Sequence, residues 1–477
     1  MDHCFLNVLP VIVAAVLTII TRETLVSLFA GIILGNIILT NGNIFAAFVK
    51  SMTDIMTQVR GNAEVIAFSL LAGALVILLQ ASGGVNGVVH SLTEKTSVVK
   101  NKKHALFLSY LIGLVLFFES SINILVSGTI AKAFSDKYKI SSEELSYESA
   151  SVCTSICGLF PFNGWGATLI GIIGVQIAAG TISGNPSEIL IKSIPFNFYP
   201  WVTLLTLLFY IFIGKHWGPM KKASDRAKTT GKLVRDEGTP LIDTSGSQNL
   251  MRKSMKPDFM NMVLPLLVVI LMMPVGLYVT GNGNMIHGSG SISVYWAVSA
   301  ALICTAFYYI VVKKIMSGKE YMAYFYKGAE NMVPVIILLA MSFTIGEVAS
   351  QLNIGKYFAA LINGRIHRIF EPTVIFILSA VISFATGTSW GTFALMMPVG
   401  LQMSSVTGSH MVLTVSSVIS GALMGGSCSP VSDISVLSSM AAGADHIDHI
   451  KTQVPYAILN GIISTVLFII SGYIFNR

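Results

Sequence analysis

Charged residues are scarce in this sequence. Asp, Glu, Lys and Arg make up only 11% of its 477 residues, whereas hydrophobic residues make up 53%. Soluble domains usually carry about 25% charged residues, so the composition excludes an ordinary soluble protein. The net charge of +7 does not indicate nucleic-acid binding, because membrane proteins collect Lys and Arg in their cytoplasmic loops. The composition predicts an all-α polytopic membrane protein.

The sequence also lacks the usual signs of enzymes, metal proteins and secreted proteins. The five cysteines lie mostly in apolar runs, and none has the spacing of a metal site. No Walker-type phosphate loop occurs, so we expect no ATP hydrolysis and an ion gradient as the driving force. No nucleophile and base cluster occurs, so we expect no enzyme, no catalytic residue and no cofactor. The N-terminus lacks the features of a signal peptide, so its apolar run is expected to be a retained span.

Long apolar runs dominate what is present. A helix needs roughly 20 apolar residues to cross about 30 Å of hydrocarbon. Such runs occur at 4–20, 24–41, 63–81, 147–180, 197–215, 258–279, 292–312, 329–351, 411–445 and 453–475. The runs 147–180 and 411–445 exceed one span and contain interrupting polar residues, which predicts broken helices. Two further regions, 104–134 and 372–406, are interrupted halfway into pieces too short to span, which predicts re-entrant hairpins.

Basic residues assign the two sides of the membrane. The polar segment 216–257 is the most basic, which marks it as cytoplasmic. Counting spans outward from it places the N-terminus and the uncharged loop 280–291 outside. We therefore expect an N-terminal transmembrane repeat at 1–215, a cytoplasmic linker loop at 216–257 and a C-terminal transmembrane repeat at 258–477.

The two halves share an order of elements. When Ser120 is aligned with Ser389, Pro161 falls on Pro430, so each half has a hairpin followed by a helix that breaks near a proline. Each half then has five spans, one of them broken, and one re-entrant hairpin. An odd number of crossings inverts the second half, which predicts an inverted repeat with a site between the halves. A chance similarity of two apolar profiles is the alternative.

Polar residues at these interruptions are the candidate site. Ionisable groups within spans are costly and usually functional, and Glu119 and Asp433 stand out. Na+ prefers oxygen ligands, and the carbonyl ends of broken helices attract cations. We expect an ion or substrate site formed by Glu119, Ser120, Asn123, Asn163, Thr388, Ser389, Ser429, Ser432 and Asp433. The Na+ candidates among these residues are Glu119, Asn123, Thr388 and Asp433.

Simpler roles are open for the same residues. Asp433 follows a Ser-Pro-Val-Ser run that is typical of a helix N-cap, and Glu119 could be a carboxylate in water at the hairpin turn. The serines and threonines could serve helix packing alone. Glu347 would be a proton carrier if it faces the bundle and a solvated group if it lies at the outer interface. The run 445–449 has the residue types of a metal site, but we expect a helix cap with solvated charges.

Several of these stretches resemble the NhaC-type Na+/H+ antiporter family of the ion transporter superfamily. The second half contributes TGTSWGT at 386–392, CSPVSD at 428–433 and DHIDHIKTQVPY at 445–456, and the first half contributes FFESSIN at 117–123. The resemblance implies a secondary transporter of the bacterial cytoplasmic (inner) membrane, with inverted repeats, two hairpins and transport by alternating access.

The chain departs from the family pattern in two places. It has Gly-Gly-Ser at 425–427 where the family has Gly-Asp-His, and it has Glu119 and Ser120 where the family has adjacent acids. Two hypotheses therefore stand: a Na+/H+ antiporter in which Glu119 and Asp433 alternate between Na+ and H+, and a Na+-coupled symporter of an amino acid or small organic acid. The expected partners are the lipid bilayer, Na+ and H+ or a small organic solute; nucleic acid is excluded, and a homodimer is left open.

Overall fold

The computed structural model is helical throughout the part of the chain that it describes. That part comprises residues 5–7, 9–21, 24–94, 99–117, 120, 123–124, 127–128, 132, 134–161, 163–240, 257–283, 288–352, 367–430 and 432–476. Within it, seven helices have the length and apolarity to cross a membrane, or eight if the bent pair α9 (Ser142–Leu159) and α10 (Gly164–Ala178) is one span. The expected all-α polytopic fold is confirmed.

Each expected unbroken span corresponds to a single helix. These helices are α1 (Leu9–Thr21), α2 (Thr24–Leu39), α4 (Ala63–Ala81), α12 (Phe198–Ile213), α14 (Met260–Thr280), α15 (Gly290–Ala306) with the π-helical turn η5 (Phe307–Val312), α16 (Gly318–Gln351) and α22 (His446–Phe475). The run 63–81 agrees with its helix at both ends, whereas the helices of the runs 329–351 and 453–475 begin 11 and 7 residues earlier than expected. Helices and turns outside the expected spans are η1 (Phe5–Asn7), α3 (Ile44–Gly61), α5 (Gly84–Glu94), α8 (Ser135–Tyr138), α11 (Pro186–Ser193), η2 (Ile194–Phe196), α13 (Gly218–Thr230) and η6 (Arg368–Phe370).

Both long apolar runs are broken helices. The axis bends by 41° between α9 and α10, and the second run divides into α20 (Met411–Cys428) and α21 (Asp433–Ala442). The side chain of Asn163 caps α10 by accepting a hydrogen bond from the Gly166 amide at 2.9 Å. Ser432 occupies the corresponding N-cap position of α21. The suggestion that Asp433 is the N-cap is therefore wrong by one residue, because Asp433 is the first residue inside α21.

The region 372–406 forms a helical hairpin. Its arms are α18 (Glu371–Thr386) and α19 (Ser389–Thr407). Gly387, between them, has a φ of 69°, a left-handed conformation that glycine adopts without steric strain. The hydroxyl of Thr407, at the far end of α19, donates a 2.6 Å hydrogen bond to the Glu371 carboxylate at the start of α18. The two outer ends of the hairpin therefore lie together, as a re-entrant segment requires.

The region 104–134 also turns back on itself. Its first arm is α6 (Lys102–Val115), and only single residues and pairs of the returning arm are described. The Ser109 hydroxyl on α6 donates to the Ser127 carbonyl of the returning arm at 2.9 Å. The Tyr138 hydroxyl beyond the hairpin donates to the Val99 carbonyl before it at 2.6 Å. The flanks of this hairpin therefore also lie side by side.

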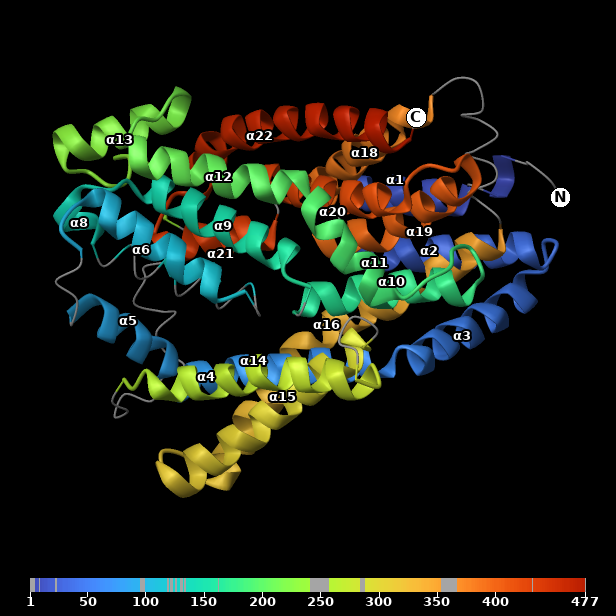
Figure 1. The fold of residues 1–477 in the computed structure, drawn as a ribbon, viewed down its shortest axis with the longest axis horizontal. Coiled ribbons are helices and arrows are strands. Elements are labelled where there is room, and N and C mark those ends of the chain that lie inside the picture. The colour runs from blue at the N-terminus through green and yellow to red at the C-terminus, as the bar shows by residue number, and fades with distance from the viewer. Residues whose placement is uncertain are drawn as a thin grey trace.

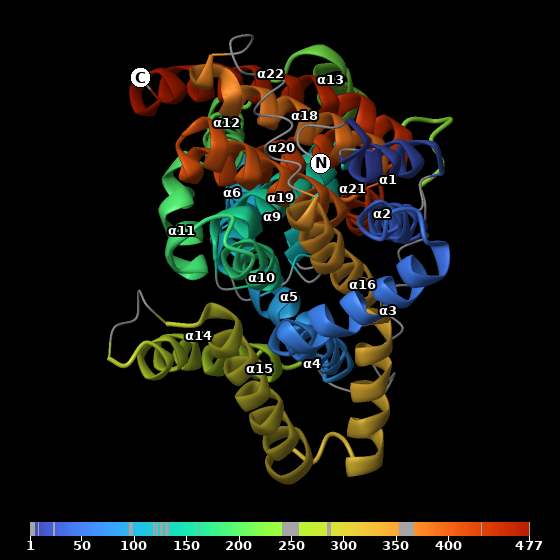
Figure 2. The same cartoon turned by 90° about the vertical axis from the view of Figure 1, so that its right-hand side faces the viewer.

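The helices form two groups that do not follow the order of the sequence. Figures 1 and 2 show α4, α5, α14 and α15 in a smaller group and α6, α9–α12 and α18–α22 in a larger one. Each group has its own apolar core, with Leu78 and Tyr309 in the smaller and Phe343 and Phe393 in the larger. The helix α16 runs from one group to the other (Figure 2) and packs on both α4 and α19. Both sequence halves thus contribute helices to both groups.

The contact between α4 and α16 depends on two glycines. A Cβ atom at Gly73 would lie 2.4 Å from the Gly328 carbonyl oxygen, and one at Gly328 would lie 2.3 Å from the Gly73 carbonyl oxygen. Small residues let the backbones of membrane helices approach this closely. The crossing fixes α16 to the smaller group.

Part of the segment 216–257 is a packed helix and not a loop. Helix α13 packs on α9 and α22. Arg226 of α13 donates two hydrogen bonds to the Glu143 carboxylate of α9, at 2.8 and 2.9 Å. Further along, the Thr239 amide donates to the Asp445 carboxylate at 3.0 Å. Residues 241–256 lie outside the described part of the chain.

Candidate functional site

The expected site residues that the structure describes lie mainly at the ends of interrupted helices. Ser429 follows the last residue of α20, Asn163, Thr388 and Ser432 precede α10, α19 and α21, and Ser389 opens α19. Glu119 and the side chain of Asp433 lie outside what the structure describes. Helix N-termini attract anions and C-termini attract cations, so these ends place opposite partial charges close together.

The hairpin at 104–134, called hairpin one, contacts α9 and the break between α9 and α10. The Asn163 amide group donates to the carbonyls of Phe117 at 3.0 Å and of Cys157 at 2.9 Å. The Cys153 thiol lies 3.2 Å from the Ser120 carbonyl oxygen. Because the Asn163 side chain also caps α10, all of its polar atoms are engaged with protein groups. Asn163 therefore shapes the break and connects it to the hairpin.

Asn123 has an unused oxygen atom. The residue is fully buried, and its amide nitrogen donates to the Gly113 carbonyl at 2.7 Å. Its Oδ1 atom makes no hydrogen bond to any residue that the structure describes. Buried polar atoms nearly always have a partner, so this oxygen is available to a cation. In contrast, the hydroxyl of Thr388, the other described Na+ candidate, accepts a long hydrogen bond of 3.4 Å from the Gly391 amide.

The hairpin at 372–406, called hairpin two, is hydrogen-bonded to α20 before the break that ends this helix. The hydroxyls of Ser389 and Ser383 donate to the same carbonyl, that of Ala422, at 3.2 and 2.6 Å. A Cβ atom at Gly426 would lie 3.1 Å from the Ser389 hydroxyl. Ser389 therefore contributes a packing and hydrogen-bonding contact between hairpin two and α20.

Helix α22 is hydrogen-bonded to the backbone at the second break, which lies between α20 and α21. The Gln453 amide group donates to the Ser427 carbonyl at 2.5 Å, and Nε2 of His446 lies 2.6 Å from the Pro430 carbonyl oxygen. The two carbonyls lie at the end of α20 and within the break. This network orients the backbone that an ion at the break would meet.

His446 and His449 of α22 both contact the hydroxyl of Ser439. Its hydroxyl lies 3.0 Å from Nδ1 of His446 and 2.8 Å from Nδ1 of His449, whose Nε2 lies 2.6 Å from the Gln453 Oε1 atom. Asp445 does cap α22, as expected, by accepting from the Asp448 amide at 2.9 Å. The expectation of solvated charges fails for His449, which is fully buried. Within the described residues, no group of three His, Cys, Asp or Glu side chains could hold a metal ion.

The first broken helix packs against helices of the other half. Trp165, at the start of α10, packs edge-on against Trp390 and Phe393 of α19, with ring centroids 6.0 Å apart in both pairs. A Cβ atom at Gly158, near the end of α9, would lie 2.4 Å from the Leu423 side chain of α20. The two arms of the first broken helix therefore contact hairpin two and α20 of the second half.

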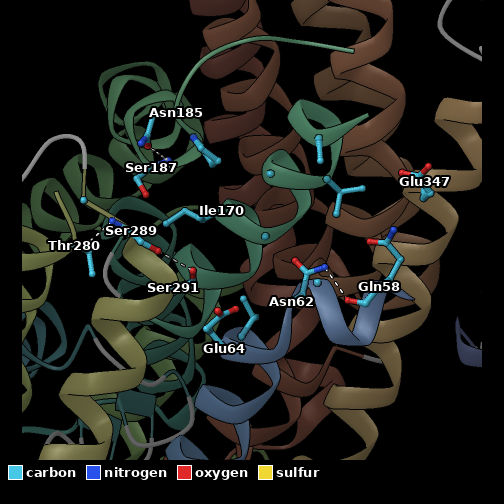
Figure 3. Close-up of a pocket in the computed structure, with 18 of the residues that line it drawn as sticks. Gln58, Asn62, Glu64, Ile170, Asn185, Ser187, Thr280, Ser289, Ser291 and Glu347 are labelled. Carbon is cyan, nitrogen blue, oxygen red and sulfur yellow. Dashed lines mark hydrogen bonds between the residues drawn. The ribbon is translucent and has the colours of Figure 1, made fainter. Parts of the chain in front are cut away.

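A polar cavity of about 480 Å³ is lined in part by α10, the helix that follows the first break. Figure 3 shows that its lining comes from α3, α4, α10, α11, α16 and the segment between α14 and α15. Glu64 and Glu347 both line it, together with Gln58, Asn62 and Asn185. Glu347 is half-buried and accepts a 2.8 Å hydrogen bond from Gln351. Sequence patterns could not reveal this cavity, because its residues are scattered across both halves.

Two aromatic side chains lie beside the start of α10. Val65 lines the cavity, and Phe68 lies about one turn further along α4. A Cβ atom at Gly164 would lie 3.5 Å from the Phe68 ring and 3.8 Å from the Trp390 ring. The start of α10 is therefore covered by these two rings.

Comparison with known proteins agrees with a transporter fold. The fold is similar to that of the YdaH transporter of Alcanivorax borkumensis, with a TM-score of 0.61 and 14% identity, covering 89% of this chain and 88% of that one. The chain is 29% identical to an uncharacterized protein of Haemophilus influenzae over 98% of its own length and 91% of that protein. It is 27% identical to the malate-2H+/Na+-lactate antiporter of Bacillus subtilis over 32% of this chain and 35% of that protein.

A family model gives the assignment. The model described as the Na+/H+ antiporter family matches residues 156–473. This match includes the second broken helix, hairpin two and most of the first broken helix. This multi-pass membrane protein therefore belongs to the Na+/H+ antiporter family.

Proposed function

We propose that the chain is a Na+/H+ antiporter of the NhaC type that works by alternating access in a bacterial cytoplasmic membrane. The observation that carries the proposal is the packing of the first broken helix against hairpin two of the other half, seen in the contact of Trp165 with Trp390. Broken helices at such a meeting point supply backbone groups that bind ions in secondary transporters. The order of elements supports an inverted repeat as the origin of this symmetry, and a transporter family is consistent with a non-enzymatic protein.

The described residues supply hard oxygen ligands of the kind that Na+ prefers. The free Oδ1 atom of Asn123 lies on hairpin one, and Ser429 lies fully buried in the second break. Asp433 begins the helix that follows this break, and Glu119 belongs to the same hairpin as Asn123. We propose that these groups form one Na+ site and that the two carboxylates exchange Na+ for H+.

The cavity provides an approach from outside. Its lining includes residues beside the loop 280–291, which the charge pattern places on the external side. Phe68 and Trp390 lie beside Gly164, at the start of the helix that follows the first break. We propose that the smaller helix group moves relative to the larger one and displaces these rings when the site opens outward.

A second function is favoured by the size of the cavity. A volume of about 480 Å³ far exceeds that of one Na+ ion and falls in the range of about 300–1,000 Å³ that is typical of small-molecule sites. A Na+-coupled symporter of an amino acid or small organic acid would use this volume. The carboxylates of Glu64 and Glu347 would then favour a solute that carries an amino group.

Reconstitution decides between the two functions. The purified chain is placed in proteoliposomes with a trapped pH indicator, and a Na+ gradient is imposed without any organic solute. Proton movement under these conditions supports antiport. Movement of a labelled amino acid or organic acid alone supports symport, and movement of neither contradicts both.

Asp433→Asn tests the Na+ site. We expect Na+-driven transport to fall at least about tenfold, because a contact to a charged group contributes about 1.5–3 kcal/mol. Asp258→Asn is the control, since Asp258 forms a partly exposed ion pair of 2.7 Å with Lys313 away from the breaks. Full Na+-driven transport by the Asp433→Asn variant would remove Asp433 from the site.

A further inference from the structure

Glu148 is a buried carboxylate that has no part in the site described so far. It lies on α9 with 2% of its surface exposed. Neither of its oxygens makes a hydrogen bond to any residue in the described part of the chain. An unpaired charge is strongly unfavourable in a buried position, and Glu is almost never fully buried unless it is paired. We therefore expect this buried carboxyl group to be protonated.

Neighbouring polar groups of α6 are already engaged. The Ser109 hydroxyl and the Tyr110 backbone amide of this helix lie near Glu148. The Ser109 hydroxyl, however, donates its hydrogen to the Ser127 carbonyl at 2.9 Å. Glu148 thus lies beside the first hairpin without taking part in its hydrogen bonds.

Glu144, one turn earlier on α9, has the opposite environment. One of its oxygens lies 2.6 Å from Nζ of Lys102, and the other lies 2.9 Å from Nε2 of His216. The other ring nitrogen of His216 lies 3.3 Å from the Tyr456 hydroxyl. The two carboxylates on consecutive turns of α9 therefore have different partners. Glu144 is paired with two basic groups, whereas Glu148 is paired with none among the described residues.

Glu148 lies between this paired cluster and the first helix break. With a rise of 1.5 Å per residue, it is about 6 Å along the axis from Glu144 and about 16 Å from Leu159. In between, α9 contacts hairpin one through Cys153. Figure 1 shows α6 and α9 side by side along this stretch. A proton on Glu148 would thus lie on the line from the predicted cytoplasmic side to the ion site.

We propose that Glu148 relays the proton that the carboxylates of the Na+ site release or take up, and that Glu144, Lys102 and His216 form its path to the cytoplasmic side. The inference rests on the proposed antiport. In one orientation the carboxyl group holds its proton. In the other, water between α6 and α9 solvates the carboxylate and accepts the proton as it leaves, and no other bond is made or broken. Histidine suits such a path because it gains and loses protons near neutral pH.

Other titratable groups lie on the helices that pack against α9. They include Lys103, His104 and Tyr110 on α6, Tyr199 and Tyr210 on α12, Lys221, Lys222, Asp225, Arg226 and Lys228 on α13, Cys428 on α20, Asp433 at the start of α21, and His446, Asp448, His449, Lys451 and Tyr456 on α22. Arg226 is paired with Glu143, Asp448 with Arg235, and His449 is bonded to Gln453. The charges that act on Glu148 are those of Glu144 and Lys102.

Glu148→Gln in the reconstituted full chain tests the proposal. We expect Na+-driven proton movement to fall roughly a hundredfold, the lower end of the loss caused by removing a proton-transferring side chain. Exchange of radioactive Na+ for unlabelled Na+, which moves no net proton, should continue at the rate of the unaltered protein. Glu148→Asp keeps a carboxyl group and should retain proton movement with an altered pH profile.

Glu371→Gln is the matched control. Glu371 is also buried, with 1% of its surface exposed, but it is bonded to Thr407 at the outer end of hairpin two. This variant should keep both kinds of exchange. The proposal is overturned if Glu148→Gln moves protons at the unaltered rate, or if it stays folded and loses both exchanges. If the unaltered protein moves no protons with Na+, the proposed antiport itself fails, which is a separate result.

Discussion

At the residue scale, Asn163 shows how one side chain can build a site without being a ligand. Its oxygen caps α10, and its nitrogen donates to carbonyls of hairpin one and α9. The expectation of a direct ligand role for Asn163 stays a prediction, but the geometry gives it a structural role that the sequence did not show.

Asn163→Ala should destabilise the protein more than the loss of an ordinary cap does. The change removes a cap worth about 0.5–2 kcal/mol and takes the amide donor away from the carbonyls of Phe117 and Cys157. The Phe117 carbonyl keeps the Cys157 thiol at 3.5 Å, so the further loss of about 1–3 kcal/mol for an unpaired group applies to the Cys157 carbonyl. Asn43→Ala is the control, because the Asn43 side chain caps the outlying helix α3 through the Ala46 amide at 3.0 Å and makes no other hydrogen bond within the described residues. Thermal unfolding of both variants in detergent measures the difference. Equal losses of stability would show that the two carbonyl contacts contribute little.

Single residues also show which contacts could not be predicted from the sequence. The run 445–449 revealed a helix cap, because capping depends on neighbours within one turn. It could not reveal that His449 and Gln453 reach the Ser427 carbonyl, since that contact depends on where α22 packs against α20. Glu148 was missed for a similar reason, as its isolation depends on α6 and the returning arm of hairpin one.

At the element scale, the broken helices could be predicted because a run too long for one span must break or tilt. The turn in the region 372–406 was also predictable from its glycine and hydroxyl residues, but the expectation that both of its arms are too short to span is wrong, because Arg368–Thr386 is long and apolar enough to cross a membrane. Helices α3 and α13 were missed because their mixed polar and apolar faces do not produce long apolar runs. The crossing of α4 with α16 was also missed, since the partners Gly73 and Gly328 lie in different halves.

Gly73→Ala should weaken this crossing. The added methyl group would meet the Gly328 backbone at 2.4 Å, and overpacking of this kind costs about 1–3 kcal/mol. Gly318→Ala, at the start of the same helix α16, is the control because nothing lies within 4 Å of its added Cβ atom. We expect a lower unfolding temperature for Gly73→Ala alone. An unchanged unfolding temperature would mean that the two helices can separate without cost.

At the scale of the whole molecule, the order of elements was predictable but their grouping was not. The sequence suggested two successive halves, whereas the helices interleave so that α4 and α5 join α14 and α15. Interleaving depends on long-range packing that a hydropathy profile does not contain. Which side each loop faces is likewise a prediction from charge alone.

Single cysteines test this sidedness. Ser183 and Glu237 are both exposed, and the charge pattern places them on opposite sides of the membrane. We expect a membrane-impermeant maleimide to label Ser183→Cys in intact cells and Glu237→Cys only after permeabilisation. The unaltered protein supplies the background from its native cysteines. The reverse pattern would invert the topology and turn the polar cavity toward the cytoplasm.

The continuous helix α16 sets how movement can pass through the molecule. It has 34 residues, or about 51 Å at 1.5 Å per residue. One portion is locked to α4 at Gly328, and another meets α10, where Gln176 donates to the Gly346 carbonyl at 3.2 Å. The sequence places Pro334 between these two anchors, and a proline inside a helix lacks the amide that would bond one turn back, which weakens the helix there. Movement of one helix group relative to the other would then bend α16 between its anchors.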